Sequence, residues 1–468
     1  MSKTVPPSGD LLNHIDQEFG AAIARLDTFL RIPSIGTDPA YDADTRRAAD
    51  WLVEQLTEIG FDASARPTPG QPMVVAHCHE AGPDAPHLLY YGHYDVQPAD
   101  PLELWDSPPF EPSIVESAHG KKIVARGAVD DKGQVMTWLE AMRAWRAVRG
   151  KFPVNLSVLC EGEEESSSKS MVPFLKTNAD ELTADVCVIS DTGMLGVDQP
   201  AMTTILRGLA YLEVEIEGPS HDLHSGMYGG VALNPIHVLS KIIAELHGAD
   251  GQVMVDGFYD GIIEPTAADL AGWDAAGIDQ QAFVESIGLS QSHGERGQSV
   301  MSQIWARPCL DINGIWGGYT GEGSKTVIPC KAHAKLSCRL VPGQDSAQIM
   351  GSIKNFFQNR LPADAKITFH EHGRGNAIKV PDQSVFMDAA KSAAAKVFDR
   401  DAVLIGCGGS IPIVTWLKQH LGMDSLLLGF ALDDDRMHSP NEKFELTCLE
   451  RGIKTHALML NQLAASSG

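Results

Sequence analysis

The stretch His87-Leu-Leu-Tyr-Tyr-Gly-His-Tyr-Asp95 sets the pattern from which the fold is predicted. It is a short apolar run, sized for a buried strand, that ends in an imidazole and a carboxylate. Three further apolar runs of similar length occupy residues 154–160, 184–190 and 425–432. Helical periodicity separates several of them, as in residues 135–148. Apolar runs that alternate with helices are typical of a sheet covered on both faces, so we predict an α/β domain.

Reactive side chains follow each of these runs. The first leads into His93 and Asp95, and the second leads into Glu161-Gly-Glu-Glu-Glu165. Asp191 follows the third run, and Met437-His438-Ser-Pro follows shortly after the fourth. In open α/β sheets, ligands bind beyond the carboxyl ends of the strands. We therefore expect these acids and imidazoles to gather at one rim of the sheet.

The donor types in this set predict a site for divalent metal ions. Histidine and carboxylate ligands without thiolates suit Zn²⁺, Mn²⁺ or Co²⁺. The segment Ala125-Arg-Gly-Ala-Val-Asp-Asp-Lys-Gly133 adds carboxylates on a glycine-flanked turn, just before the 135–148 helix. One carboxylate can bridge two cations about 3.5–4 Å apart. Two cations also offset the repulsion among so many anionic ligands, so the pattern favours a two-metal site.

The rhythm changes between about residues 207 and 375. In residues 212–217 apolar side chains alternate with glutamates, which is typical of a strand with one solvated face. Helical periodicity follows in residues 235–246. We therefore predict a smaller α+β domain, residues 207–375, that acts as an inserted lid. The catalytic domain would then be discontinuous and consist of residues 1–206 and 376–468.

The composition excludes some classes of partner. Among the 468 residues, 37 are Lys or Arg and 61 are Asp or Glu, and the formal net charge is −24. Nucleic acids and anionic membranes attract clustered basic residues, so neither partner is expected. No run approaches the roughly 18 apolar residues of a spanning helix, and the first residues lack an apolar segment. We expect a cytoplasmic protein without a disulfide framework, because none of the eight cysteines forms a CxxC pair.

Short motifs recur along the chain in a consistent order. Five surround the predicted metal site: Gly92-His-Tyr-Asp-Val-Gln-Pro98, Arg126-Gly-Ala-Val-Asp-Asp-Lys-Gly133, Glu161-Gly-Glu-Glu-Glu-Ser166, Ser190-Asp191 and Met437-His-Ser-Pro440. Four lie elsewhere: Asp222-Leu-His-Ser-Gly226, Ser324-Lys-Thr-Val-Ile-Pro329, Arg339-Leu-Val-Pro342 and Gly408-Gly-Ser-Ile-Pro412. Together they resemble the dinuclear metallopeptidase family of carnosinase, cytosolic non-specific dipeptidase, glutamate carboxypeptidase, aminoacylase and succinyl-diaminopimelate desuccinylase. The four motifs that lie away from the predicted metal site look most like those of the carnosinase and dipeptidase branch.

The resemblance implies a fold and a ligand set. The fold would be a zinc-exopeptidase-like α/β domain, with a mixed sheet and helices on both faces, that carries the inserted α+β lid and dimerisation domain. Asp130 would bridge two Zn²⁺ ions per subunit, with Mn²⁺ or Co²⁺ as alternatives. His93 and Asp191 would complete the first metal, and Glu165 and His438 the second. In this family the Asp130–Asp131 peptide bond is typically cis.

The resemblance also implies catalytic and substrate-binding residues. Glu164 would be the general base, and Asp95, a carboxylate beside the metal-bound imidazole of His93, would orient that ring. His224 would stabilise the oxyanion and would reach the site of the partner subunit in a homodimer formed through the lid. Arg339 suits a bidentate grip on a substrate carboxylate. Weaker substrate-contact candidates are Ser410, Thr326 and His372.

The expected activity is hydrolysis of the amide bond in dipeptides or short peptides that carry a free carboxylate. The nearest alternative is an amidohydrolase that acts on N-acyl or N-carbamoyl amino acids with the same site. A dinuclear phosphoesterase and a non-catalytic protein that binds amino-acyl ligands are more distant alternatives.

Two stretches admit more than one interpretation. In the run Glu163–Glu165, alignment on the Glu-Glu-Ser step makes Glu164 the base and Glu165 the ligand. A slip of one residue would reassign both roles. His77-Cys78-His79 has the composition of a metal cluster, but it precedes the first catalytic strand, and we interpret it as incidental.

Overall fold

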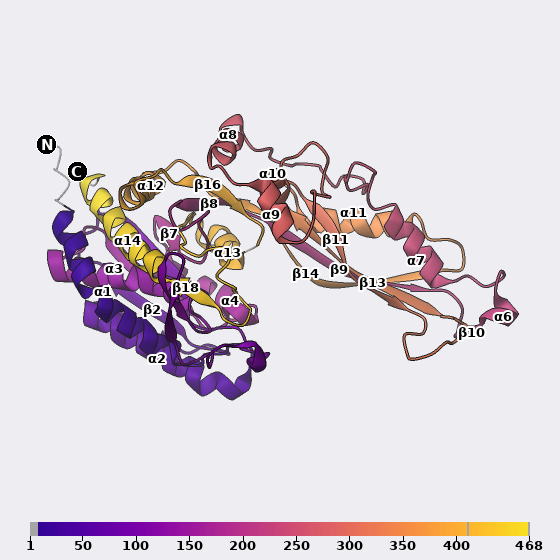
Figure 1. Cartoon of the computed structure of the whole chain (residues 1–468), viewed down its shortest axis with the longest axis horizontal. Helices are drawn as coiled ribbons and strands as arrows, with labels where there is room; N and C mark the ends of the chain where they lie inside the picture. The colour runs from indigo at the N-terminus through magenta and orange to yellow at the C-terminus, as the bar shows by residue number, and fades with distance from the viewer. Residues whose placement is uncertain (1–7, 410, 467–468) are drawn as a thin grey trace. The chain divides into compact units, whose positions relative to one another are not determined.

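The computed structural model describes residues 8–409 and 411–466, which form two compact units. The first unit comprises the chain up to Thr204, Val380–Leu404 and the segment from Ile413 onward. The second comprises Ile205–Lys379 and Ile405–Pro412. Figure 1 shows the elements of each unit, coloured along the chain. The division at 206 and 376 into a catalytic domain and a lid stays a prediction.

A mixed sheet forms the centre of the first unit. Its strand order is β1 (Asp62–Arg66), β2 (Met73–Cys78), β6 (Asn155–Glu161), β3 (His87–His93), β7 (Val186–Ile189), β17 (Ser425–Leu427) and β8 (Ala201–Leu206). Strands β6, β3, β7 and β17 run parallel, whereas β1, β2 and β8 pair antiparallel with their neighbours. Every residue of β6 and β7 is buried, because helices cover both faces. The predicted α/β fold with a mixed sheet is confirmed.

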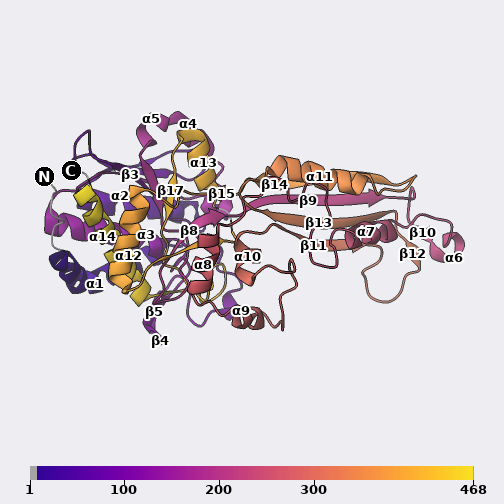
Figure 2. The same cartoon turned by 90° about the horizontal axis from the view of Figure 1, so that it is seen from above.

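Helices lie on both sides of this sheet. On one side are α1 (Gly9–Leu30), α2 (Asp42–Ile59), α3 (Lys132–Arg149), α12 (Val385–Phe398) and α14 (Leu446–Ser466). In Figure 2, α4 (Met171–Thr177), α5 (Ala179–Leu182) and α13 (Pro412–Leu421) lie on the opposite side. A continuous apolar core joins the helices to the strands. Within it Tyr90 of β3 stacks on Trp138 of α3 with ring centroids 4.5 Å apart.

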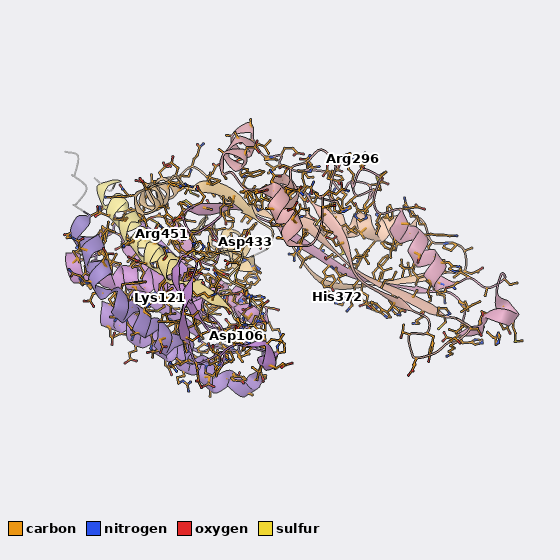
Figure 3. All side chains as sticks on the ribbon, in the orientation of Figure 1. Asp106, Lys121, Arg296, His372, Asp433 and Arg451 are labelled. Atoms are coloured by element: carbon orange, nitrogen blue, oxygen red, sulfur yellow. The ribbon has the colours of Figure 1, made fainter. Side chains whose placement is uncertain are left out.

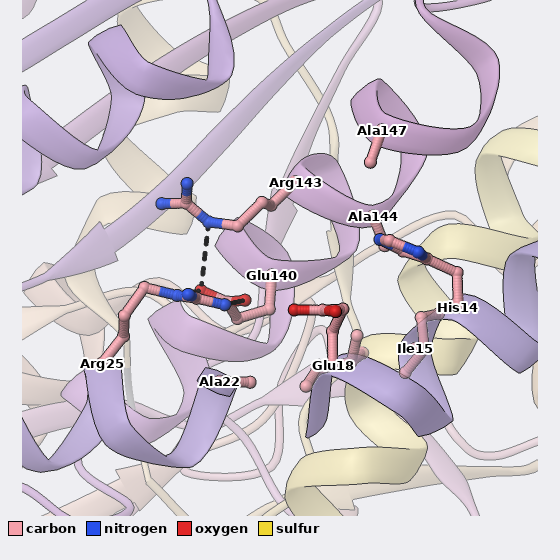
Figure 4. Close-up of a pocket in the computed structure, with 10 residues that line it drawn as sticks. His14, Ile15, Glu18, Ala22, Arg25, Glu140, Arg143, Ala144 and Ala147 are labelled. Atoms are coloured by element: carbon pink, nitrogen blue, oxygen red, sulfur yellow. Dashed lines mark hydrogen bonds and ion pairs between the residues drawn. The ribbon is translucent and has the colours of Figure 1, made fainter. Parts of the chain in front are cut away.

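A buried ion pair connects α1 to α3. Arg25 donates two hydrogen bonds to Glu140, at 2.7 Å and 2.6 Å, and the Glu140 side chain is only 5% exposed. Arg143 lies 3.5 Å from the same carboxylate. Figure 4 shows these residues around a pocket that His14 and Glu18 also line. Since none of the predicted site residues lines this pocket, we assign it to helix packing.

A second sheet of the first unit supports the turn before α3. It consists of β4 (Ser113–Ser117), β5 (Gly120–Val124) and β18 (Lys443–Glu445) in the order β18-β5-β4. Short 3-10 helices are η1 (Pro39–Tyr41), η2 (Leu102–Leu104) and η3 (Glu164–Ser166). No helix among the described residues has the length and apolarity needed to cross a membrane.

The second unit is an antiparallel sheet with helices on one face. The strand order is β11 (Cys309–Gly317), β13 (Lys331–Leu340), β9 (Gly208–Glu217) and β14 (Lys366–Gly375). Alternate residues of β9 are buried, and the buried ones pack with α7 (Pro235–Ala244) and α11 (Ser346–Gln358). The alternation predicted for residues 212–217 therefore places apolar side chains on one face of this sheet and glutamates on the other. The remaining elements are β10 (Leu223–His224), α6 (Ser225–Tyr228), α8 (Ala267–Ala275), α9 (Gln280–Ser286), α10 (Val300–Trp305) and β12 (Val327–Ile328). Two further strands, β15 (Ile378–Lys379) and β16 (Val403–Cys407), both pair with β8 and complete the nine-stranded mixed sheet.

Candidate metal centre

The parallel strands of the first unit deliver their polar ends to one edge of the sheet. His93 is the last residue of β3, and Asp191 follows shortly after β7. Strand β6 ends at Glu161, just before the turn that carries Glu164 and Glu165. Because β6, β3 and β7 run in the same direction, their carboxyl ends meet at one edge.

Two groups of potential ligands share one aspartate at this edge. Within each group, the ligand atoms all lie within 4.8 Å of one another. The first group is His93, Asp130 and Asp191, and the second is Asp130, Glu165 and His438. Oδ1 of Asp130 is 3.1 Å from Nε2 of His93, whereas Oδ2 is 2.8 Å from Nε2 of His438. The two oxygens of Asp130 thus face different imidazoles, as a bridging carboxylate would require.

Asp95 connects the first group to the turn that carries the second. Its carboxylate lies 3.4 Å from Nδ1 of His93, on the ring edge away from Asp130. It also accepts hydrogen bonds from the backbone N–H groups of Glu164 and Glu165, at 3.2 Å and 3.1 Å. The fit is tight, because a Cβ atom placed on Gly36 would lie 2.3 Å from Oδ2 of Asp95. Asp95 therefore positions both a ligand and the turn beside it.

The three consecutive glutamates of the turn point to different surroundings. Glu163 is buried and accepts hydrogen bonds from the backbone N–H groups of Gln71 and Ser170. Glu165 belongs to the second ligand group. Glu164 belongs to neither group, although Asp191 and Glu165 are close enough to influence its charge. The register in which Glu164 is the base and Glu165 the ligand stays a prediction.

The turn that carries Asp130 is held by a residue that the sequence interpretation missed. Glu442 is fully buried and accepts backbone hydrogen bonds from Gly127, Val129 and Asp130, at 2.9 Å to 3.0 Å. Its carboxylate also accepts a 2.8 Å hydrogen bond from Arg126. Glu442 lies just beyond the Met-His-Ser-Pro motif, so its position in sequence next to a predicted ligand was the available signal.

Asp131 likewise supports the site through a hydrogen bond to backbone. The Asp130–Asp131 peptide bond is cis, as the resemblance implied. Oδ2 of Asp131 accepts a 3.1 Å hydrogen bond from the backbone N–H of His93. Asp131 therefore belongs to neither ligand group and secures the end of β3 instead.

The electrostatics of the site favour bound cations. Burial raises the pKa of Asp191 to about 7 and that of Glu164 to about 8, and neighbouring carboxylates add to both shifts. The carboxylates of Asp130 and Glu165, which accept hydrogen bonds from His438, raise the pKa of His438 to about 10. The partner of the buried Oε1 atom of Glu165 is Nε2 of His438, at 3.4 Å. Several carboxylates and two imidazoles so close together form a donor set that fits divalent metal ions.

The remaining predicted residues belong to the second unit. His224 ends β10 and caps the N-terminus of α6, where its Nδ1 accepts a hydrogen bond from the backbone N–H of Gly226. It pairs with Val327 of β12, the residue after Thr326. Arg339 lies on β13 and His372, labelled in Figure 3, lies on β14; these two strands flank β9. The ring of His372 packs on that of Tyr211, with centroids 5.1 Å apart. Ser410 lies outside the described residues.

Comparisons with known proteins identify related sequences and structures. The model of peptidase family M20/M25/M40 matches residues 89–462. The Cys-Gly metallodipeptidase dug1 of Schizosaccharomyces pombe is 31% identical over 97% of this chain and 98% of its own length. The human Beta-Ala-His dipeptidase is 29% identical over 86% of this chain and 79% of its own length. The structure of the dipeptidase Dug1p from Saccharomyces cerevisiae, at 30% identity, covers 99% of both chains with a TM-score of 0.79.

Proposed function

This chain belongs to peptidase family M20/M25/M40. On that premise we propose that it cleaves dipeptides with two divalent cations bound at the carboxyl ends of strands β3, β6 and β7. The observation that carries the proposal is the pair of ligand groups that share Asp130. The resemblance to metallopeptidases that the motifs indicated is confirmed. The chain is therefore a metal-dependent hydrolase.

The dipeptide is the substrate class that the relatives favour. Those that match over nearly the whole chain are named as Cys-Gly metallodipeptidases, and others as Beta-Ala-His dipeptidases. The amidohydrolase alternative, with N-acyl or N-carbamoyl amino acids as substrates, is not favoured by these relatives. Membership in a peptidase family also leaves the phosphoesterase and the non-catalytic binding protein without support.

The residues around the metal ligands would divide the work of amide hydrolysis. A pair of Zn²⁺ ions, or Mn²⁺ in their place, would supply Lewis-acid chemistry by acidifying water and polarising the carbonyl group. Glu164 would take the proton of the attacking water and return it to the leaving amine. Burial and nearby carboxylates raise the pKa of Glu164 to about 8, and two bound cations would favour the carboxylate form that can accept a proton. Asp95 would keep His93 oriented throughout the reaction.

The polar face of the second unit offers groups for the rest of the substrate. Arg339 would bind the free carboxylate of the dipeptide in a bidentate manner. His224 would donate a hydrogen bond to the developing oxyanion, and Thr326, beside it, would contact the substrate. His372 and Ser410 are weaker candidates for such contacts. These assignments rest on the motifs that resemble the carnosinase and dipeptidase branch.

We also propose a homodimer formed through the second unit, in which His224 serves the site of the partner. The second unit exposes large apolar side chains that a partner could cover: Met227 is 74% exposed, Val231 90% and Ile315 56%. Ile315 lies on β11, which is an edge strand of its sheet. Exposed apolar groups on an unpaired edge are typical of an interaction surface. The cytoplasmic location expected from the sequence stays a prediction.

A substrate screen on reconstituted protein tests the proposed function. The protein is dialysed against EDTA, reloaded with a single metal, and assayed with dipeptides and with N-acyl amino acids. We expect activity to disappear with the metal and to return for dipeptides, with two metal equivalents per chain by elemental analysis. Turnover that survives EDTA, or that is confined to acyl amino acids, would contradict the proposal.

A further inference from the structure

Three imidazoles converge on one hydroxyl group at the end of the sheet opposite the metal ligands. Nδ1 of His77 lies 2.7 Å from Oγ of Ser157, Nε2 of His87 lies 2.7 Å from it, and Nε2 of His79 lies 3.0 Å from it. The rings of His79 and His87 are 4.6 Å apart, and those of His77 and His79 are 5.1 Å apart. A hydroxyl group can donate one hydrogen bond and accept two, so the three imidazoles use its full capacity.

The backbone register of three neighbouring strands creates this convergence. Strands β2 and β3 both pair with β6, with His77 opposite Ser157 and His87 opposite Asn155. Residues two apart in an extended segment share a face, so Asn155 lies on the face of Ser157 and His79 lies on the face of His77. The side chain of Asn155 further binds the backbone of Ala81 and Gly82, in the loop between the outer histidines. The cluster is therefore fixed by the sheet.

The hydrogen bond of His77 to Glu181, outside the cluster, leaves the lone pair of Nδ1 facing Ser157. Its Nε2 lies 2.9 Å from Glu181, and two hydrogen bonds from Arg66 hold that carboxylate in place. In the tautomer that donates its Nε2–H to this carboxylate, Nδ1 carries the lone pair and faces Ser157. Metal-bound histidines commonly have a carboxylate behind the ring in this way.

The other two imidazoles are also held in the form that binds metals. Burial lowers the pKa of His87 to about 4, and burial together with the neighbouring His77 lowers the pKa of His79. Both rings are therefore neutral near pH 7, and a neutral ring can offer its lone pair. The carboxylate of Asp185 accepts a 2.8 Å hydrogen bond from the backbone N–H of His87, so a second negative charge lies beside the cluster.

We propose that His77, His79 and His87 bind one additional transition-metal ion of the Zn²⁺ class, separate from the catalytic pair. Three imidazoles with an open fourth position suit Zn²⁺. Unlike the ligand atoms of the catalytic groups, the three nitrogens are not all within 4.8 Å of one another. Zn–N bonds of about 2.0–2.1 Å therefore require Ser157 to turn aside and each nitrogen to move inward by somewhat less than about 1 Å. His79 is exposed to solvent, so an ion can enter.

This site is remote from the predicted catalytic centre. His87 and His93 are the two ends of β3, six residues apart, which corresponds to about 20 Å of strand. The interpretation of His77-Cys78-His79 as incidental thus gives way to a site of its own. Its third ligand, His87, could not be recognised from sequence spacing, because the pairing of β2 and β3 with β6 brings it into the cluster.

The test measures metal stoichiometry in holoenzyme whose catalytic site is already loaded with Zn²⁺. Equilibrium dialysis against excess Zn²⁺, followed by elemental analysis, compares wild type with the double variant His79→Gln/His87→Gln. We expect wild type to retain one more equivalent than the double variant, with dipeptide turnover unchanged in both. Added Co²⁺ should likewise produce the visible absorption of a tetrahedral site in wild type alone.

Two further variants separate a built site from adventitious binding. His119→Gln removes an exposed histidine from the β4–β5 turn and should keep the additional equivalent. Ser157→Ala removes only the hydroxyl group and should also keep it, because the three nitrogens remain. Equal metal content in wild type and the double variant, or equal loss in His119→Gln, would overturn the proposal.

Discussion

Nε2 of His438 lies 2.8 Å from Oδ2 of Asp130, although 308 residues of chain separate them. The second unit lies between the two residues in sequence, yet both belong to the first unit. The second ligand group therefore forms only after the first and last segments of the first unit have folded together. Because the two ligand groups share only Asp130, a substitution at any other ligand affects one group alone.

Loss of a ligand from the second group should remove one metal and leave the other. In Glu165→Ala we expect the metal content to fall from two equivalents to one, because His93, Asp130 and Asp191 remain. Dipeptide turnover should fall by at least about 100-fold, since one Lewis acid is missing. Elemental analysis and a steady-state assay measure the two effects. Full retention of both metals would show that Glu165 is not a ligand.

Replacement of the proposed base should affect turnover without affecting metal content. We expect Glu164→Gln to lower kcat by about 10²–10⁴-fold, because the amide cannot accept the proton of the attacking water. Its neighbour provides the control: Glu163→Gln should reduce stability while largely preserving kcat, since Glu163 holds backbone groups. The opposite pattern would mean that the register of the glutamate run is displaced by one residue.

The buried pair of Glu442 and Arg126 should contribute to both stability and metal affinity. Glu442→Gln leaves the guanidinium without its charged partner, and breaking a buried pair costs about 3–5 kcal/mol. Metal binding should weaken as well, because glutamine offers the backbone of the Asp130 turn one acceptor oxygen where the carboxylate offers two. Urea unfolding of the metal-free protein and competition with a chelator measure these effects. A double variant, Arg126→Gln/Glu442→Gln, should recover part of the stability if the unpaired charge is the cause.

A buried histidine should make the stability depend on pH. Burial lowers the pKa of His456 from 6.5 to about 3, so the folded state keeps the ring neutral. The unfolded chain gains a proton below pH 6.5, and stability therefore falls as the pH decreases toward 3. The loss is about 1.4 kcal/mol per pH unit, or about 2 kcal/mol between pH 6.5 and about 5. Urea unfolding should give a shallower pH dependence for His456→Gln than for wild type or for His119→Gln.

Mixing two inactive variants tests whether His224 acts on the site of a partner. We expect His224→Ala and Glu164→Gln each to have little activity alone. In a mixed dimer, one site would combine an intact Glu164 with an intact His224 from the other subunit. Unfolding and refolding an equimolar mixture should then restore about a quarter of the wild-type rate. No recovery, together with a dimeric mass by sedimentation, would place His224 in the site of its own subunit.

The sequence was sufficient to predict the fold class because apolar runs and helical periods report burial directly. The strand-end residues His93, Asp191 and Glu165 were predictable for a related reason, since parallel strands end at a common edge. The run 425–432 was less informative: only Ser425–Leu427 forms a strand, and backbone hydrogen bonds join the remainder to Ile189, Thr192 and Met194.

Residues that act through distant hydrogen bonds could not be predicted. Glu442 supports a turn more than 300 residues earlier, and no local pattern indicates that pairing. Glu163 lies in an acidic run of the kind that is usually solvated, but it is buried because Gln71 and Ser170 provide backbone donors. The histidine cluster depends on the register of β2 and β3 against β6, which periodicity alone cannot determine.

The close approach of Gly36 to Asp95 shows how far the requirements of catalysis extend. Gly36 has no functional group, yet a single added methyl group would displace the carboxylate that steadies His93. An alanine at this position should therefore impair the enzyme indirectly, because it changes the position of Asp95 and removes no reactive group. Surveys of damaging substitutions that look only at reactive side chains would overlook such a position.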